Sequence, residues 1–378
     1  MIKEIEIIGL FGEMDIKLPL TGKNSLSENS DVVVLIGENG SGKTTVLNIL
    51  NSLMNLDKPG KNLDKISNLI FKEVIIKTVN NKFTITSELV KAFINVIKLT
   101  GGINKEVQLL LLKNNISEND INKLSNENKA NYELILKNKD KITLFADLSI
   151  EFNKFNKGML FFPTYRRIEN NIQLSKDSKK ILQNENMFFG MNDIENLINN
   201  SVGKVKTVSS IGFEEIRTLL SEMKTSKNPE EISKKIEEVD EKNSKEFNKL
   251  KHFVDTCNKY LFRKEIIFIP EKFELYIEKE NKKRVSLDNL SSGEKQMVSI
   301  FAQLYLKDDK DLIIIFDEPE LSISVEWQKM LLPDMLKSNK IKQLIVATHS
   351  PSIFHDDELF KNTIDIHDHI TYISADDD

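Results

Sequence analysis

The stretch Gly37-Glu38-Asn39-Gly40-Ser41-Gly42-Lys43-Thr44 decides the fold of this chain. It follows an apolar, β-branched run from Val32 to Ile36, which predicts a buried strand, and it precedes a helical pattern that begins at Thr45. Glycines and a lysine at these spacings, between a strand and a helix, are typical of a phosphate-binding P-loop. An ordinary glycine-rich turn is the alternative, and it is disfavoured because every fixed position of the motif is filled.

The chemistry of phosphate binding explains the residue types in this loop. Gly37, Gly40 and Gly42 carry no side chains, so several backbone N–H groups can reach phosphate oxygens at once. Lys43 supplies a mobile charge for the β- and γ-phosphates, and the Thr44 hydroxyl can join the coordination shell of Mg²⁺. We therefore predict ATP and Mg²⁺ as ligands. The predicted ATP-binding residues are Gly37, Glu38, Asn39, Gly40, Ser41, Gly42, Lys43, Thr44 and Thr45.

Length and composition set the limits for the rest of the chain. Its 378 residues, 40% hydrophobic and 29% charged, suit a globular protein of one large domain or two ordinary ones. The formal charge of −5 argues against a protein that only coats nucleic acid, because such proteins are usually basic. A single cysteine, Cys257, allows no intrachain disulfide, and the apolar runs are shorter than the ~20 residues of a membrane span. We expect a cytoplasmic protein without a membrane partner.

A coarse secondary structure follows from periodicity. Alternating apolar and polar residues predict strand pairs at 2–8 and 14–18 and at 71–78 and 82–86, and Met159–Phe162 reads as a buried strand. Helical patterns fill most of the chain between residue 87 and residue 262.

One of these helices is predicted to begin near Asn228, because asparagine is a good N-cap and Pro229 suits the first helical position. Apolar residues from Ile232 to Leu261 form one seam along it, interrupted by Asn243. The seam fits either a helix packed on its own domain or a self-associating arm, and the interruption favours the first.

A second group of motifs begins at Leu290-Ser291-Ser292-Gly293-Glu294-Lys295-Gln296, which puts serine and glycine at a helix N-terminus, a geometry that can bind an anion. The buried run Leu312–Phe316 then delivers Asp317 and Glu318 at the carboxyl end of a strand, where open α/β sheets bind ligands. We predict that Asp317 holds Mg²⁺ through water and that Glu318 is the general base toward the attacking water. His349 ends a further buried run. A lone histidine is usually structural, but its place after a P-loop and an acidic pair favours a γ-phosphate contact.

The order of these motifs resembles that of the ABC-type ATPases. The runs Asp317–Leu321, Trp327-Gln328 and Ala347–Pro351 look like the RecF/SMC/OLD branch of that group rather than the transporters. The segment Phe162–Arg167 is similar to ATPase subunits of bacterial anti-phage systems of the Septu and PARIS types. It would lie where the family has its Q-loop, for which Gln173, Arg166 and Arg167 are the candidates.

This resemblance implies an α/β P-loop ATPase head with an antiparallel β subdomain and an inserted helical region. It divides the chain into 1–86, the N-terminal part of the head; 87–262, a mainly helical insert with a Q-loop-like segment near 159–173; and 263–378, the C-terminal part of the head. It implies ATP hydrolysis by a homodimer or higher homo-oligomer joined through ATP. The signature residues that would cap the nucleotide of the second subunit are Ser291, Ser292, Gly293 and Glu294.

The resemblance also implies a partner. We expect a separately encoded effector, a nuclease, controlled in anti-phage defence. The alternative is a DNA-repair or chromosome-maintenance head that clamps DNA, with Arg166-Arg167, Lys179-Lys180 and Lys282–Arg284 as candidate basic contacts. A transporter motor is disfavoured because the helical insert separates the P-loop from the signature.

Two departures from the family pattern deserve a test. Ser292 stands where the usual signature has glycine, and Ser322, Ser324 and Val325 replace the residues common after the Glu-Leu pair, so hydrolysis is expected to be slow.

Only a short segment follows His349, too short for a nuclease domain. Its histidines and aspartates are interpreted as a solvated terminus, since their spacing matches no usual metal framework.

Overall fold

A parallel sheet forms the centre of the molecule and joins segments that lie far apart in the sequence. The computed structural model describes residues 1–23, 30–54, 66, 68–91, 158–163, 190–223 and 229–373. The strand order in the central sheet is β12-β3-β11-β10-β6. These strands are β3 (Asp31–Ile36), β6 (Met159–Phe162), β10 (Leu312–Asp317), β11 (Ile341–Ala347) and β12 (Thr363–Asp365). All their pairings are parallel, so their carboxyl ends share one edge.

Both faces of this sheet are buried, which explains its nearly continuous apolar strands. In β3, Val33 and Leu35 belong to one hydrophobic cluster, and Val32 and Val34 belong to another. Helix α1 (Lys43–Met54) packs in the first cluster, as predicted for the helix after the P-loop. Helices α11 (Ser292–Leu306) and α12 (Val325–Leu336) pack in the second, so they cover the opposite face.

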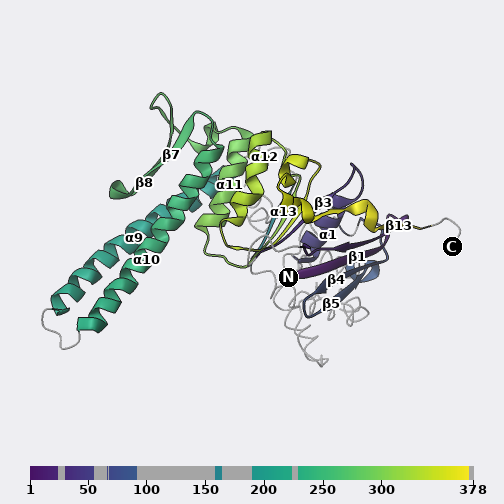
Figure 1. Ribbon diagram of the computed structural model, residues 1–378, viewed down its shortest axis with the longest axis horizontal. Coiled ribbons are helices and arrows are strands. Elements are labelled where there is room, and N and C mark those ends of the chain that lie inside the picture. The colour runs from purple at the N-terminus through teal and green to yellow at the C-terminus, as the bar shows by residue number, and fades with distance from the viewer. Residues whose placement is uncertain are drawn as a thin grey trace, which may run out of the picture.

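An antiparallel sheet of order β13-β2-β1-β4-β5 continues the cluster that contains α1. The two predicted strand pairs are confirmed, with Ile7 opposite Ile16 in the first and Ile76 opposite Phe83 in the second. Parallel and antiparallel sheets in one head confirm the predicted fold class, and Figure 1 shows the strands β1, β4 and β5 beside α1. The strands are β1 (Ile2–Leu10), β2 (Met14–Pro19), β4 (Glu73–Thr78), β5 (Lys82–Thr86) and β13 (Ile370–Tyr372).

Most histidines and aspartates of the last segment are exposed, as interpreted, but the segment is not a simple solvated terminus, because it adds two strands to the sheets. After the short helix α13 (Asp357–Lys361), β12 pairs with β3 at the edge of the central sheet, and β13 pairs with β2 in the antiparallel sheet. Ile364 and Ile366 are buried in the cluster beside α1. The strands were missed because each has only three residues, too few for alternation to show.

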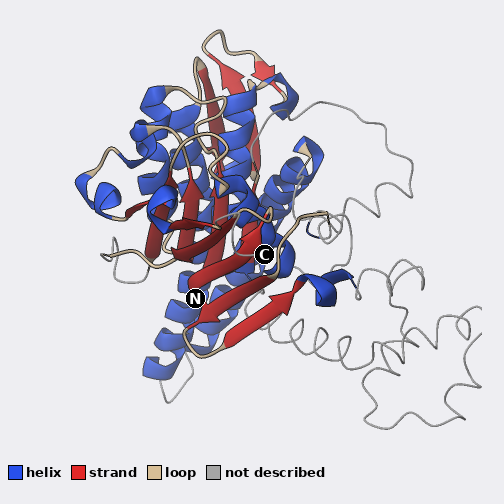
Figure 2. Ribbon diagram, turned by 90° about the vertical axis from the view of Figure 1, so that its right-hand side faces the viewer, coloured by secondary structure: helices blue, strands red, loops and turns tan. Residues whose placement is uncertain are grey.

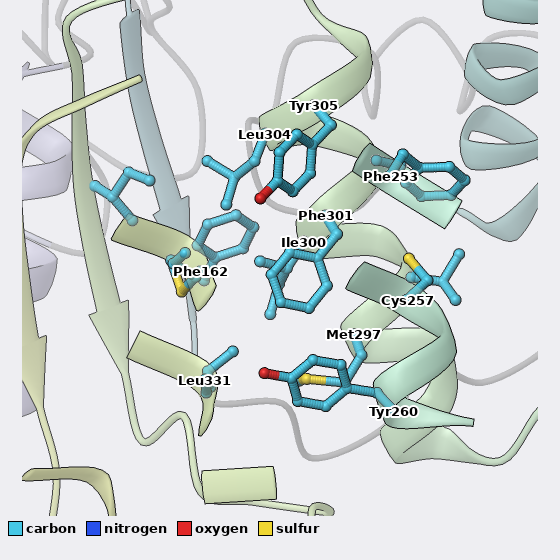
Figure 3. Packing of buried hydrophobic residues seen from close by; sticks show 14 of the residues in the cluster. Phe162, Phe253, Cys257, Tyr260, Met297, Ile300, Phe301, Leu304, Tyr305 and Leu331 are labelled. Atoms are coloured by element: carbon cyan, nitrogen blue, oxygen red, sulfur yellow. The ribbon is translucent and has the colours of Figure 1, made fainter. Parts of the chain in front are cut away.

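The opposite face of the central sheet has an aromatic core. The Tyr260 ring lies 5.2 Å from that of Phe301 on α11, and Phe162 on β6 lies 5.1 Å from Phe316 on β10. Figure 3 shows Phe162, Tyr260 and Phe301 gathered in this layer with Met297. A small antiparallel sheet stands beside it, formed by β7 (Lys264–Ile269), β8 (Glu274–Lys279) and β9 (Arg284–Val285). This packing fixes the start of α11 relative to the central sheet.

Two long helices, α9 (Met191–Met223) and α10 (Pro229–Cys257), form an arm that extends from the head in Figure 1. The seam of α10 packs along α9, and its last turns enter the aromatic core of the head, where Phe253 and Cys257 are fully buried. Asn243, the predicted interruption, faces Gly212 of α9: a Cβ at Gly212 would lie 2.3 Å from its Nδ2. The interruption thus has a matching glycine on the neighbouring helix.

Several predictions fall outside the described residues. They are the N-cap Asn228, the Q-loop candidates Arg166, Arg167 and Gln173, and the basic pair Lys179-Lys180. The helical pattern after residue 91 falls outside them as well. Within the described part of the chain, none of the helices is both long and apolar enough to cross a membrane.

Candidate nucleotide-binding site

The P-loop connects the carboxyl end of β3 to the first turn of α1, as the sequence predicts. Gly37 and Gly42 have φ angles of 147° and 94°, in a region that L side chains rarely adopt. A Cβ at Gly37 would also lie 2.7 Å from the Ile366 side chain. The central part, Glu38 to Gly40, is exposed, and Thr45 is half-buried on the first turn of α1. The loop therefore presents backbone rather than side chains at a helix N-terminus without an acidic residue in its first turn.

Lys43 lies inside the curve of this loop. Its Nζ donates hydrogen bonds to the carbonyl oxygens of Gly37 and Glu38, at 2.8 and 3.0 Å, and to the Ser41 hydroxyl at 3.3 Å. Burial lowers the pKa of Lys43 below its usual value, against the opposing effect of four nearby carboxylates. These belong to Glu318, Asp317, Asp365 and Glu320. This negative charge would oppose the binding of a triphosphate, and a divalent cation would offset part of it.

The Thr44 hydroxyl donates a hydrogen bond to Oδ1 of Asp317 at 3.1 Å. The two residues are 273 positions apart in the chain, and the parallel alignment of β3, β11 and β10 brings them to one edge. A threonine hydroxyl and a carboxylate are hard oxygen donors of the kind that Mg²⁺ prefers. The donor set therefore fits the ion that the sequence predicts at Thr44 and Asp317.

Glu318 and His349 face each other at the same edge. Nε2 of His349 lies 3.2 Å from Oε1 of Glu318. Burial, followed by the nearby Glu320 carboxylate, raises the pKa of Glu318 above its usual value. A carboxylate with a raised pKa is a stronger base, which suits the predicted role in activating water. The structure thus brings the P-loop, the acidic pair and the histidine together.

The signature segment is built differently. Ser291 is the N-cap of α11, and its hydroxyl accepts a hydrogen bond from the Glu294 amide at 3.3 Å. The Glu294 carboxylate accepts bonds from the amides of Ser291 and Phe262, at 2.7 and 3.1 Å, and pairs with Lys264 at 2.8 Å. Glu294 is only 1% exposed. Its predicted contact with a second subunit is therefore not available to its carboxylate, which is used within its own chain.

The other signature residues face outward or pack on a neighbouring loop. Ser291 and Ser292 are exposed, whereas Gly293 is buried against the loop after β10. A Cβ at Gly293 would lie 2.3 Å from the Ser322 carbonyl oxygen, so only glycine fits. The signature and the P-loop lie at the starts of α11 and α1, which cover opposite faces of the central sheet. The two motifs therefore belong to different layers of the molecule.

Sequence reasoning missed three residues of this region. Asp365 lies beside Gly37, with Oδ1 at 3.5 Å from the position of a Cβ there, and no motif marks its three-residue strand. Lys264 compensates the buried charge of Glu294, a long-range pairing that composition does not reveal. Glu320 was quoted only as part of a resemblance. Its position two residues after the predicted base was the available signal.

Comparisons with known proteins show which family the chain is similar to. The family model described as "AAA domain, putative AbiEii toxin, Type IV TA system" matches residues 32–354. No curated protein matches the chain. One similar solved structure is the Smc head domain of Pyrococcus furiosus, which has an extended coiled coil and is bound to the C-terminal domain of ScpA. It is 14% identical in sequence with a TM-score of 0.38, and the match covers 99% of this chain and 96% of that chain. An SmcHead bound to the C-winged helix domain of ScpA is 13% identical at 0.42, covering 99% and 98%.

Proposed function

Because the chain belongs to this AbiEii-type AAA-domain family, we propose that it is an Mg²⁺-dependent ATPase that dimerises on ATP and controls a separately encoded effector. The observation that carries the ATPase part is the convergence of three pairs at one sheet edge. They are Lys43 with its own loop, Thr44 with Asp317, and Glu318 with His349. A phosphate cradle, a pair of oxygen donors for a cation and a base beside a histidine are the parts that phosphoryl transfer to water requires.

Each residue has a distinct task in this proposal. The P-loop amides and Lys43 bind the β- and γ-phosphates, and Thr44 and Asp317 hold Mg²⁺, which neutralises phosphate charge when bound. Oε1 of Glu318 orients the attacking water and accepts its proton. Nε2 of His349, which lies 3.2 Å from that oxygen, would contact the γ-phosphate and orient the base.

Dimerisation through ATP is supported by the separation of the two motifs. Ser291 and Ser292 are exposed at the start of α11, beside the loop that follows β10, whereas α1 lies over the opposite face of the central sheet. A second copy related by a two-fold axis would place its signature over the first copy's P-loop, and the reverse, to give two composite sites. Only the γ-phosphate would touch both subunits, so ADP should bind without joining them.

The effector part rests on the resemblance to ATPase subunits of anti-phage systems and on the toxin–antitoxin description of the family. We propose a nuclease as the effector, regulated by the ATP-bound dimer. The P-loop geometry is common to this proposal and to a DNA-clamping head, so a binding partner is what distinguishes them.

The experiment therefore compares two variants recovered from the native host. Glu318→Gln should accumulate in the ATP-bound form, and Lys43→Ala should not bind ATP. A nuclease that co-purifies with the first variant and not with the second supports effector control. DNA recovered without a protein partner would favour the DNA-clamping alternative, and equal recovery of the nuclease with both variants would contradict control by ATP.

A further inference from the structure

The segment that carries His349 is held by one carboxylate. Oε2 of Glu320 accepts a hydrogen bond from the Thr348 hydroxyl at 2.7 Å. Oε1 of Glu320 accepts bonds from the amides of His349 and Ser350, at 2.8 and 3.2 Å. Donors from three consecutive residues thus converge on the Glu320 side chain, and hydrogen bonds to an ionised acceptor are the stronger kind.

A second side chain reinforces the connection. Oε1 of Gln328, on α12, accepts a bond from the Ser350 hydroxyl at 2.6 Å. Its Nε2 donates to the carbonyl oxygens of Ile323 and Glu320, at 3.2 and 3.4 Å. The loop after β10 and the segment after β11 are therefore linked through both Glu320 and Gln328, which bond the amide and the hydroxyl of Ser350 respectively.

The same loop carries the predicted base and contacts the signature. Glu318 and Ser322 both have positive φ, 52° and 70°, so the loop is tightly constrained without glycine. The Ser322 carbonyl oxygen packs against Gly293 at the start of α11. A displacement of this loop would consequently move Glu318 and, through Glu320, the backbone of His349.

We propose that Glu320 is a positioning residue for hydrolysis. It holds the His349 backbone so that the His349 imidazole faces Glu318. It also couples that backbone to the loop after β10, which contacts the signature. The proposal rests on the proposed function, since it takes Glu318 as the base. Glu320 need not touch the nucleotide in this account. Its effect passes through the Thr348–Ser350 segment.

Substitutions at Glu320 separate this role from general stability. Glu320→Ala removes the acceptor for all three donors, and misplacement of a catalytic group can cost about 10- to 100-fold in turnover. Glu320→Gln should retain most activity, because its amide oxygen can accept from His349 and Ser350 while its NH₂ donates to the Thr348 hydroxyl. Thr348→Val removes one donor and should give an intermediate loss. Glu326→Ala, which removes an exposed carboxylate at the start of α12, is the matched control.

Two measurements are made on the four variants. Steady-state kinetics and ATP binding should show reduced kcat in Glu320→Ala with affinity within about twofold of the wild type, the signature of an effect on the chemical step. Hydrogen exchange followed by mass spectrometry should show faster exchange of the 348–350 amides in Glu320→Ala but not in Glu320→Gln or Glu326→Ala.

Unchanged exchange or unchanged kcat in Glu320→Ala would overturn the proposal, as would an equal loss in Glu326→Ala. If Glu320→Ala does not fold, Thr348→Val decides: wild-type kcat and exchange in that variant would overturn it. Failure of the proposed function is recognised separately, by wild-type turnover in Glu318→Gln, because the exchange measurement does not depend on ATP hydrolysis.

Discussion

The P-loop and the signature both place a serine and a glycine at the start of a helix. The N-termini of the two helices, α1 and α11, nevertheless differ in the charged groups beside them. At the P-loop, the first turn of α1 contains no acidic residue, and Lys43 lies among the loop carbonyls. At the signature, the Glu294 carboxylate is buried against the first turn of α11 and is bonded to the amide of the cap. A helix N-terminus attracts an anion only where its own sequence has not already provided one. The P-loop helix therefore leaves its N-terminus available to phosphate, whereas the start of α11 already holds a carboxylate and exposes Ser291 and Ser292.

The substitution Glu318→Gln should have the largest effect on turnover and should leave ATP bound at the P-loop site. The amide keeps the shape of the side chain but cannot take a proton from water, so turnover should fall by about 10²- to 10⁴-fold. ATP binding, measured by calorimetry, should persist because Thr44 and Asp317 remain. Undiminished phosphate release by the variant would show that the general base lies elsewhere.

The substitution Lys43→Ala tests whether the P-loop is the phosphate site at all. The lysine supplies the charge for the β- and γ-phosphates, so its loss should abolish detectable ATP binding, a weakening well beyond the ~30-fold that corresponds to about 2 kcal/mol. Calorimetry with Mg²⁺-ATP measures this directly. Lys17→Ala, an exposed lysine on β2, is the control and should bind like the wild type. Wild-type affinity in Lys43→Ala would remove the P-loop from the account.

The substitution Gly293→Ala tests whether the signature is fixed by packing rather than by a ligand. The new Cβ would lie 2.3 Å from the Ser322 carbonyl oxygen, a backbone atom that cannot move without the loop. We expect a loss of about 2–3 kcal/mol in the free energy of unfolding, measured by urea denaturation without nucleotide. Gly203→Ala, on α9 with open space around its Cβ position, should be neutral or stabilising. Equal stabilities for the two variants would contradict the packing constraint.

The charge at the signature gives a pH-dependent prediction. Although burial raises the pKa of Glu294, its bonds from Lys264 and from the Ser291 and Phe262 amides hold it below the ordinary value of 4.5. A depressed pKa contributes stability above 4.5 and loses it as pH falls through the folded-state value. Glu294→Gln should be less stable by about 1–2 kcal/mol at pH 7, with the difference shrinking at acid pH. A difference that grows as the pH falls would contradict this assignment.

Motif spacing predicted the surroundings of the P-loop much better than those of the signature. The P-loop, Asp317, Glu318 and His349 each follow an apolar strand, and parallel strands bring their carboxyl ends to one edge, so adjacency followed from the pattern alone. Glu294 was predicted to act across subunits, because the sequence does not show that Lys264 and the Phe262 amide lie beside it. Pairings between distant segments depend on tertiary packing, which local periodicity does not encode.

The same reason explains the errors of the fold prediction. The main strands and α1 were found from alternation and apolar runs, whereas β12 and β13 were missed, and with them Asp365 beside the P-loop. Asn243 was interpreted as an interruption of the α10 seam. Only the structure shows Gly212 opposite its side chain.

The central claim is that the P-loop site of one subunit is completed by the signature of another. A mixture of two inactive variants tests this claim. Lys43→Ala should lack nucleotide binding, and Ser291→Arg should bind ATP but fail to close the dimer because of its bulk. In a heterodimer, one composite site has both defects and the other has neither, so an equal mixture should recover up to about a quarter of wild-type turnover if the sites act independently. A mixture that stays inactive although tagged heterodimers form, together with no ATP-dependent dimer of Glu318→Gln, would contradict the shared site.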